Sequence, residues 1–215
     1  MVERVMRFCP RARSGPASPK ARLRIPRDLV TVLATAALVC IARSSLADHY
    51  RVPSGSMEPT IHVGDHIVVS KAAYGLRVPL THVQMATFGA PARGDVVVLE
   101  SPETSIVLLK RVVAVGGDRV AVHDGTLTID GVVQPTTYDG GQLEESLDGH
   151  THALGSLGGS ELSETIVPAG RILVMGDNRG NSHDGRDFGF VELNRVLGRA
   201  MAVIVREGAL GWTAL

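Results

Sequence analysis

The chain has 215 residues, 44% of them hydrophobic and 4% aromatic, and its 22 Lys and Arg residues balance 22 Asp and Glu residues. This zero net charge excludes an electrostatic bias toward nucleic acid, and the 24 glycines favour a β-rich, turn-rich body over a helical bundle. The two cysteines, Cys9 and Cys40, precede the main body, which excludes a disulfide framework, a thiol nucleophile and a cysteine-based zinc site there.

Residues 1–27 are predicted to be a disordered basic arm, because they are rich in arginine, hold one acid, Glu3, and contain four prolines. Apolar residues then run from Leu29 to Ala42, and a helix of that length spans about 21 Å, short of a hydrocarbon core of about 30 Å. Extension to Ala47 makes the segment about long enough to cross a membrane. We therefore predict a transmembrane anchor over residues 28–47.

Two alternatives stay open for the apolar segment. Ser45-Leu46-Ala47 fits the small-x-small cleavage site of a secretory signal peptide, although the basic region before the segment is long for one. A buried helix of a soluble protein is the other alternative, and the all-round apolar surface argues against it. With an anchor or a signal peptide, the positive-inside rule places the basic arm in the cytoplasm and exports the body, residues 48–215.

From residue 50 onward, short β-rich runs alternate with Gly, Pro and Asp, which predicts a mainly β body: a folded antiparallel sheet or a β-barrel-like domain. The predicted strands are His66–Ser70, Asp95–Leu99, Val107–Val115, Arg119–Val122, Thr126–Ile129, Arg171–Met175 and Gly198–Val205. Residues 138–165 are rich in Gly and Ser, and we expect them to be a flexible insertion that forms a surface loop.

The first segment that could carry chemistry is Pro53–Thr60. Gly55 permits a tight turn, and Pro53 and Pro59 stiffen the chain on both sides. A serine hydroxyl on such a turn, beside backbone N–H groups, suits a nucleophile of acyl transfer with an adjacent oxyanion hole. By itself, however, Ser-Gly-Ser between prolines is more often only a loop.

The second candidate is Lys110, within the predicted strand Val107–Val115. Alternation along a strand puts Lys110 on one face with Leu108, Val112 and Ala114. Loss of hydration on an apolar face lowers the pKa of a lysine, and a neutral lysine can act as a general base. A solvated lysine at a sheet edge is the simpler alternative that the pattern leaves open.

The third segment, Met175–Gly189, follows a predicted strand and sets Asp, Asn, Ser and Arg among glycines. Such a loop can position a buried amine through hydrogen bonds. Its Asp and Asn spacing is also similar to that of calcium-binding loops, but it lacks the bidentate Glu of an EF-hand. We predict no metal ion and no cofactor.

In this order and spacing, the three segments resemble bacterial type I signal peptidases, which are Ser–Lys proteases of bacterial inner membranes. The resemblance runs from about Tyr50 to Val205, with residues 138–165 outside it. The matching boxes are Ser54–Thr60 with Gly64-Asp65, Arg93–Val98, Lys110-Arg111 with Gly116–Asp118, and Gly176–Arg186. The residues that depart from those common in the family are Glu58, Gly180 and Gly185.

The resemblance implies a role for each matching residue. Ser56 would be the nucleophile and Lys110 the general base, and the Ser56 backbone N–H with the Ser54 hydroxyl would form the oxyanion hole. The residues implied to support the Ser–Lys dyad are Ser182, which would orient Lys110 by a hydrogen bond, and Asp184 and Arg186, which would form an ion pair. The residues implied to line pockets for small substrate residues are Val52, Met57, Leu108 and Leu109.

The resemblance further implies a single-pass protein of the cell inner membrane, with its N-terminus in the cytoplasm and its catalytic domain outside. Its expected activity is cleavage of signal peptides from exported preproteins, and its expected partners are these preproteins and membrane lipid. No nucleic acid is expected as a partner. A protease that cuts at the membrane surface should stay there, which favours the uncleaved anchor.

Four rival functions remain. One is a specialised maturation peptidase of the same Ser–Lys class. A Ser–Lys self-cleaving repressor would need an N-terminal DNA-binding domain, for which the proline-broken arm has little room. A Ser–His–Asp hydrolase is disfavoured because the chain has no G-x-S-x-G elbow. In a non-enzymatic exported β domain, Ser56 would be only a loop serine.

Overall fold

The computed structural model describes residues 26, 28–35, 47–77 and 84–215. A helix covers residues 28–35 of the predicted anchor, whereas residues 36–46 and all of the basic arm except Pro26 lie outside the described residues. Within the described part of the chain, no helix is both long and apolar enough to cross a membrane. The chain divides into two units, Met1–Ala37 and Leu38–Leu215, and the strands of the described residues all lie in the second.

The second unit is built on an eight-stranded antiparallel sheet with the order β1-β2-β16-β5-β6-β14-β15, in which β17 pairs with β16. Its strands are β1 (Ala47–Arg51), β2 (His66–Ser70), β5 (Val96–Glu100), β6 (Val107–Val115), β14 (Arg171–Met175), β15 (Val191–Glu192), β16 (Val196–Arg206) and β17 (Ala209–Ala214). Because β16 lies between β2 and β5, a strand from the end of the chain joins two strands from its first half.

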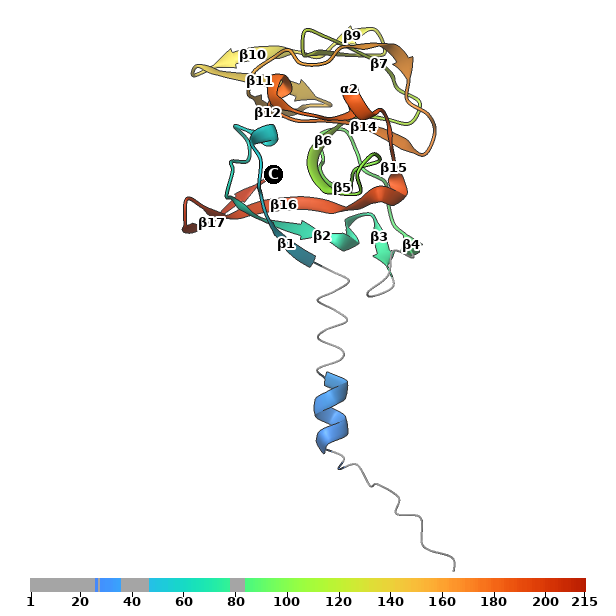
Figure 1. The fold of residues 1–215 in the computed structure, drawn as a ribbon, viewed down its shortest axis with the longest axis vertical. Coiled ribbons are helices and arrows are strands. Elements are labelled where there is room, and N and C mark those ends of the chain that lie inside the picture. Colours follow the sequence, from blue (N-terminus) through green and yellow to red (C-terminus); the bar gives the residue numbers. More distant parts are fainter. Residues whose placement is uncertain (1–25, 27, 36–46, 78–83) are drawn as a thin grey trace, which may run out of the picture. The chain divides into compact units, whose positions relative to one another are not determined.

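Three smaller sheets complete the described part of this unit, with the orders β13-β7-β8-β9, β10-β11-β12 and β3-β4. Their strands are β3 (Gly75–Arg77), β4 (Gln84–Thr87), β7 (Arg119–His123), β8 (Thr126–Ile129), β9 (Val132–Val133), β10 (Thr136–Asp139), β11 (Gln142–Leu147), β12 (His150–Leu154) and β13 (Leu162–Ile166). The short helices are η1 (Gly55–Met57), η2 (Lys71–Ala73), η3 (Arg179–Asn181), α2 (Gly185–Phe188) and η4 (Leu193–Arg195). In Figure 1, β7 and β9–β12 gather at one end of the unit, β1, β2 and β17 lie at the other, and β5 and β6 lie between them.

The mainly β, antiparallel architecture that the sequence predicts is confirmed. Four predicted strands have the observed bounds: His66–Ser70, Val107–Val115, Thr126–Ile129 and Arg171–Met175. β5 is apolar at consecutive positions because both of its faces are buried. Val96 and Val98 pack in one core cluster, and Val97 and Leu99 pack in another.

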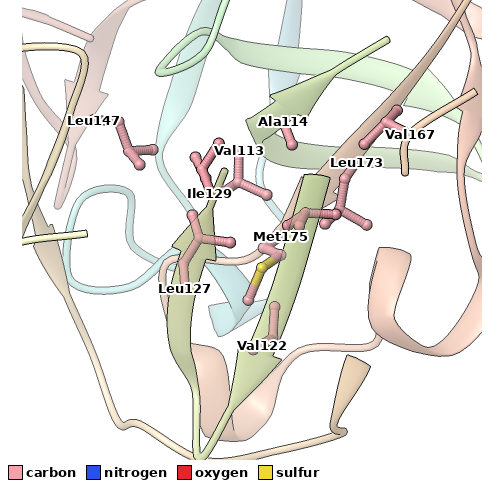
Figure 2. Close-up of a cluster of buried hydrophobic side chains, with 10 residues drawn as sticks. Val113, Ala114, Val122, Leu127, Ile129, Leu147, Val167, Leu173 and Met175 are labelled. Carbon is pink, nitrogen blue, oxygen red and sulfur yellow. The ribbon is translucent and has the colours of Figure 1, made fainter. Parts of the chain in front are cut away.

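A third core cluster joins the main sheet to the smaller sheets. It contains Val113 and Ala114 from β6 and Leu173 and Met175 from β14, together with apolar residues of β7 and β8. Figure 2 shows Leu147 of β11 as part of this cluster. The sheet β10-β11-β12 is therefore fastened to the protein body by a buried apolar side chain.

The prediction that residues 138–165 form a surface loop is wrong. Strands β11 and β12 lie in this segment, and both Leu147 and Leu154 are buried. Glu145 is also buried, and its carboxylate pairs with the guanidinium of Arg179 at 2.5 Å. The alternating pattern of β11 could not be recognised in the sequence because one of its inward side chains, Glu145, is charged. Burial of this charge depends on its partner Arg179, which lies on a loop distant in sequence.

Candidate active site

The turn that holds Ser56 is braced by backbone hydrogen bonds. Val52 N donates to Asp65 O at 2.9 Å, and Gly64 N donates to Val52 O at 2.8 Å, so the chain before the turn is tied to the chain after it. Ser56 lies in η1 with 9% of its surface exposed, and the adjacent Met57 is buried in the same core cluster as Val52. The hydroxyl of Ser56 is therefore carried by a helical turn that the core holds in place.

Lys110 lies in the middle of β6 and reaches this turn. Its Nζ is 2.6 Å from Ser56 Oγ, in a hydrogen bond between residues 54 positions apart in the chain. Only 3% of Lys110 is exposed, and burial lowers its pKa from 10.5 to about 8, although the carboxylates of Asp184 and Asp177 act to raise it. The neutral amine is therefore accessible near pH 8 and can accept a proton from the Ser56 hydroxyl.

Strand alternation places Lys110 on one side of β6 with Leu108 and Val112, which share a core cluster. The sequence also predicts Ala114 on this side, but the register of β6 with β14 shifts at Val113. Val113 and Ala114 consequently pack in one cluster, the one in Figure 2. A β-bulge changes the direction of the following side chains, and this one could not be read from the apolar run.

Arg111, the neighbour of Lys110, locks β6 to the loop that follows β14. Its Nε and Nη2 each donate to a carboxylate oxygen of Asp177 at 2.8 Å, and its Nη1 donates to Gly94 O at 2.8 Å. Burial acts to raise the pKa of Asp177, but the charge and hydrogen bonds of Arg111 hold it below its ordinary value. This bidentate pair fixes the backbone on both sides of the site.

Asp184 and Arg186 form a second buried ion pair close by. Arg186 Nε and Nη2 donate to the two oxygens of Asp184, each at 2.9 Å. Asp184 also caps α2 and accepts a hydrogen bond from Gly176 N at 3.0 Å. Burial acts to raise the pKa of Asp184, while the hydrogen bonds from Arg186 and Gly176 hold it below its ordinary value. In this loop, the carboxylates of both Asp177 and Asp184 are therefore engaged in buried ion pairs with arginines.

Two serines named from the sequence make fewer contacts than expected. Among the described residues, Ser182 Oγ is buried without a hydrogen bond of normal geometry, so the expected bond to Lys110 is not formed. The hydroxyl is, however, close enough to the Asp184 carboxyl to help lower the pKa of that group. Ser182 nevertheless lies at the site, because a side chain on Gly176 would collide with both Ser182 Oγ and Ser56 O. Ser54 precedes η1, is exposed, and its hydroxyl makes no capping hydrogen bond.

A pocket of about 190 Å³ lies along β1 and β6. Three of the four residues predicted to bind substrate, Val52, Leu108 and Leu109, line this pocket. The fourth, Met57, does not line it, because its side chain is 1% exposed and packs into the core. The pocket is lined mainly by apolar side chains, one of which, Leu109, is the sequence neighbour of Lys110.

Asn178 connects the loop after β14 to the Ser56 turn. Its backbone N–H donates to Ser56 O at 3.1 Å, and its side-chain Nδ2 donates to Gly55 O at 3.2 Å. Its Oδ1 accepts hydrogen bonds from Ser156 N at 3.3 Å and from Ser156 Oγ at 2.7 Å. Sequence reasoning placed Asn178 only within a matching box and missed Ser156, because Ser156 lies in the segment that was expected to be a surface loop.

Comparison with known proteins places these segments in one family. The family model described as "Signal peptidase, peptidase S26" matches residues 26–205. Signal peptidase I of Pseudomonas aeruginosa is 35% identical in an alignment 195 residues long, and the match covers 77% of this chain and 67% of that protein. Signal peptidase I of Leptolyngbya laminosa is 30% identical in an alignment 213 residues long, and the match covers 94% of this chain and 92% of that protein.

A solved signal peptidase I from Enterococcus faecalis V583 is 30% identical, and the match covers 51% of this chain and 95% of that one with a TM-score of 0.37. The fold assignment rests on the strand pairing of this protein, not on that superposition. The family model, in contrast, spans the Ser56 turn, β6 and the loop after β14, which together build the site. The chain therefore belongs to the signal peptidase family, peptidase S26.

Proposed function

We propose that this chain is a membrane-bound serine endopeptidase that removes signal peptides from exported preproteins, with Ser56 as nucleophile and Lys110 as general base. The observation that carries this proposal is the 2.6 Å contact between Lys110 Nζ and Ser56 Oγ, made by a buried lysine with a pKa of about 8. Membership of the signal peptidase family supplies the substrate class.

The proposed reaction proceeds in two steps. Neutral Lys110 takes the Ser56 proton as Oγ attacks the carbonyl carbon of the scissile bond, and the ammonium then gives this proton to the leaving amine. A water molecule next attacks the acyl-enzyme, with Lys110 again accepting the proton and returning it to Ser56 Oγ. The Ser56 N–H and the Ser54 hydroxyl would stabilise the negative oxygen in each tetrahedral intermediate.

Three further residues are proposed to support the dyad. The Asp184–Arg186 pair would brace the loop after β14 from within and keep a carboxylate near Lys110. Ser182 would orient the Lys110 amine when substrate is bound, since its buried hydroxyl has a free hydrogen-bonding capacity among the described residues.

Ser182→Ala should lower kcat more than it raises KM. Losing one positioning hydrogen bond in the reacting complex costs about 1–3 kcal/mol, or roughly 5-fold to 150-fold in rate. Steady-state cleavage of a preprotein by the wild type and the variant measures the two constants. Because the hydroxyl makes no hydrogen bond of normal geometry within the described ranges, thermal stability should change little. An unchanged kcat would remove Ser182 from the mechanism.

The anchor and the domain division are also part of the proposal. Residues 1–27 would be a cytoplasmic arm, residues 28–47 the uncleaved transmembrane anchor, and residues 48–215 the exported catalytic domain. The nine-residue step from Ala47 to Ser56 reaches at most about 30 Å when extended. The nucleophile would therefore stay close to the outer membrane face, where a signal peptide presents its cleavage site.

The proposed function is tested by incubating membranes that contain the full chain with a preprotein and sequencing the new N-terminus of the product. Cleavage should follow small residues at the first and third positions before the cut, which is the size preference that the family resemblance implies. An apolar pocket such as the one along β1 and β6 would enforce it by volume, at roughly 1–3 kcal/mol per methylene. The activity should stay in the membrane pellet after an alkaline carbonate wash. Efficient cleavage after bulky or charged residues, or activity released by the wash, would contradict the corresponding part of the proposal.

A further inference from the structure

The segment Ala153–Gly159, which begins with the last two residues of β12, lies between the two loops of the site. On one side, Thr60 Oγ1 of the serine segment donates to Ala153 O at 3.3 Å. On the other side, Gly155 N donates to Asp177 O at 2.9 Å, and Gly180 N donates to Ser156 O at 2.9 Å. This segment therefore contacts both loops that carry proposed catalytic residues, although the sequence predicts it to be a surface loop.

The approach at Gly155 is too close for a side chain. A Cβ at this position would lie 2.8 Å from Glu58 O and 3.0 Å from Asn178 Cγ. Glycine is thus required here by close packing against the serine segment and the Asn178 amide. This contact brings Ser156, the next residue, to the Asn178 side chain.

We infer that Ser156 and Asn178 are positioning residues for the proposed oxyanion hole. The orientation of the Asn178 amide follows from its neighbours: a backbone N–H can only donate, so the amide atom facing Ser156 N must be the oxygen. The Ser156 hydroxyl donates to the same oxygen at 2.7 Å. The NH₂ group is thereby turned toward the Gly55 carbonyl, which can only accept.

The hydrogen bond at Gly55 O acts directly on the Ser56 N–H. Gly55 C=O and Ser56 N–H belong to one planar peptide unit, so fixing the oxygen fixes the direction in which the N–H points. The Asn178 backbone N–H holds Ser56 O and fixes the next peptide plane in the same way. A peptide whose carbonyl accepts a hydrogen bond is also polarised, which makes its N–H a better donor.

This inference rests on the proposed function and adds two residues to it, neither of which touches the reacting atoms. Glu58 N also donates to Gly55 O at 3.2 Å, so the peptide keeps one hydrogen bond when Asn178 is changed. The folded turn should therefore survive the substitutions, and the effect should be on the alignment of one donor.

The test compares Ser156→Ala and Asn178→Asp with the full-length wild type in preprotein cleavage. Asn178→Asp replaces the NH₂ group that donates to Gly55 O with a carboxylate oxygen, which repels that carbonyl oxygen. We expect kcat to fall about 100-fold, which is the lower end of the loss measured when one oxyanion donor is removed. Ser156→Ala removes one orienting hydroxyl, and kcat should fall about tenfold. KM should stay unchanged in both variants, because the pocket is not altered. The acid limb of the pH–rate profile should keep its position in Ser156→Ala, whereas the added carboxylate of Asn178→Asp should move it to higher pH, since nearby carboxylates raise the pKa of Lys110; kcat is therefore compared on the plateau above the limb. Ser156→Thr should restore most of kcat.

A peptide aldehyde gives a second readout, because its adduct with the serine hydroxyl places an oxygen anion in the hole. Its affinity should fall by the same factor as kcat in both variants, while the affinity of the cleaved product peptide stays constant. Ser146→Ala is the matched control. Ser146 Oγ of β11 bonds Thr151 Oγ1 of β12 at 2.9 Å, outside the segment Ala153–Gly159, and its loss should leave kcat unchanged.

If the wild type cleaves the preprotein and both variants keep its kcat, the inference fails and the proposed function stands. A rise in KM alone would also overturn the inference, since the segment would then bind substrate and not align the Ser56 N–H. An inactive wild type would overturn the proposed function and the inference together.

Discussion

Lys110→Met should abolish preprotein cleavage and at the same time make the folded protein more stable at neutral pH. Methionine keeps the apolar stem of the side chain beside Leu108 and Val112 but has no group that can accept the Ser56 proton. Arginine should fail as well, because a guanidinium stays protonated at any pH that the protein tolerates. Both variants are to be assayed at the pH optimum of the wild type.

The stability change follows from the lowered pKa of Lys110, from 10.5 to about 8. The unfolded chain holds the lysine proton more tightly than the folded chain does, so protonation of Lys110 favours unfolding. This loss of stability has its full size below pH 8 and disappears as the pH rises toward 10.5. The cost at neutral pH is about 3 kcal/mol, which Lys110→Met should recover. Unfolding of the detergent-solubilised chain by heat or denaturant at pH 7 measures the gain.

The pH profile of the wild type gives an independent check. The acid limb of kcat/KM should lie near pH 8, because kcat/KM reports the pKa of Lys110 in the free enzyme. The acid limb of kcat should lie at lower pH, because bound substrate excludes more water from Lys110 and lowers its pKa further. Lys71→Met is the matched control, since Lys71 Nζ pairs with Asp48 at 3.0 Å away from the dyad. Substantial cleavage by Lys110→Met would end the Ser–Lys mechanism.

Ser56→Ala should lower kcat by a factor on the order of 10⁶, the loss seen when a serine nucleophile is removed. The fold should persist, because the side-chain contact of Ser56 is the hydrogen bond to Lys110, worth about 1 kcal/mol. Preprotein should still bind to the variant, since the pocket along β1 and β6 is untouched. Cleavage assays, a binding measurement and thermal unfolding separate these three expectations.

Ser54→Ala is the discriminating control, because Ser54 lies in the same turn but is exposed and precedes η1. Ser54 is proposed as a donor to the oxyanion, so removal of its hydroxyl should lower kcat by a factor of about 10²–10³. This loss is far smaller than the one expected for Ser56→Ala. An acylating inhibitor should add its mass to the peptide that contains Ser56 in the wild type and to neither serine in Ser56→Ala. Turnover that survives in Ser56→Ala would contradict the proposed nucleophile.

Turn signals alone did not decide which strands could be predicted. Thr126–Ile129, which was predicted, lies between the Asp124-Gly125 and Asp130-Gly131 turns, where all four residues have positive φ angles. β11 also lies between positive-φ turns, Gly140-Gly141 and Asp148-Gly149, but it was not predicted because its inward residues include Glu145, whose burial is balanced by Arg179 on a distant loop. Charged residues inside a strand erase the alternation on which such predictions depend.

The sequence by itself determined the mainly β body, the serine on a proline-flanked turn and the lysine inside an apolar run, because turn chemistry and side-chain alternation depend on neighbours in the chain. Only the tertiary structure decided which of these groups meet. Lys110 is joined to Ser56 across 54 positions, Arg111 to Asp177 across 66, and Asn178 to Gly55 across 123. The same packing buries Met57 in the core and Lys110 beside the serine. A lowered lysine pKa arises from desolvation by residues far away in sequence, so no local pattern could establish it.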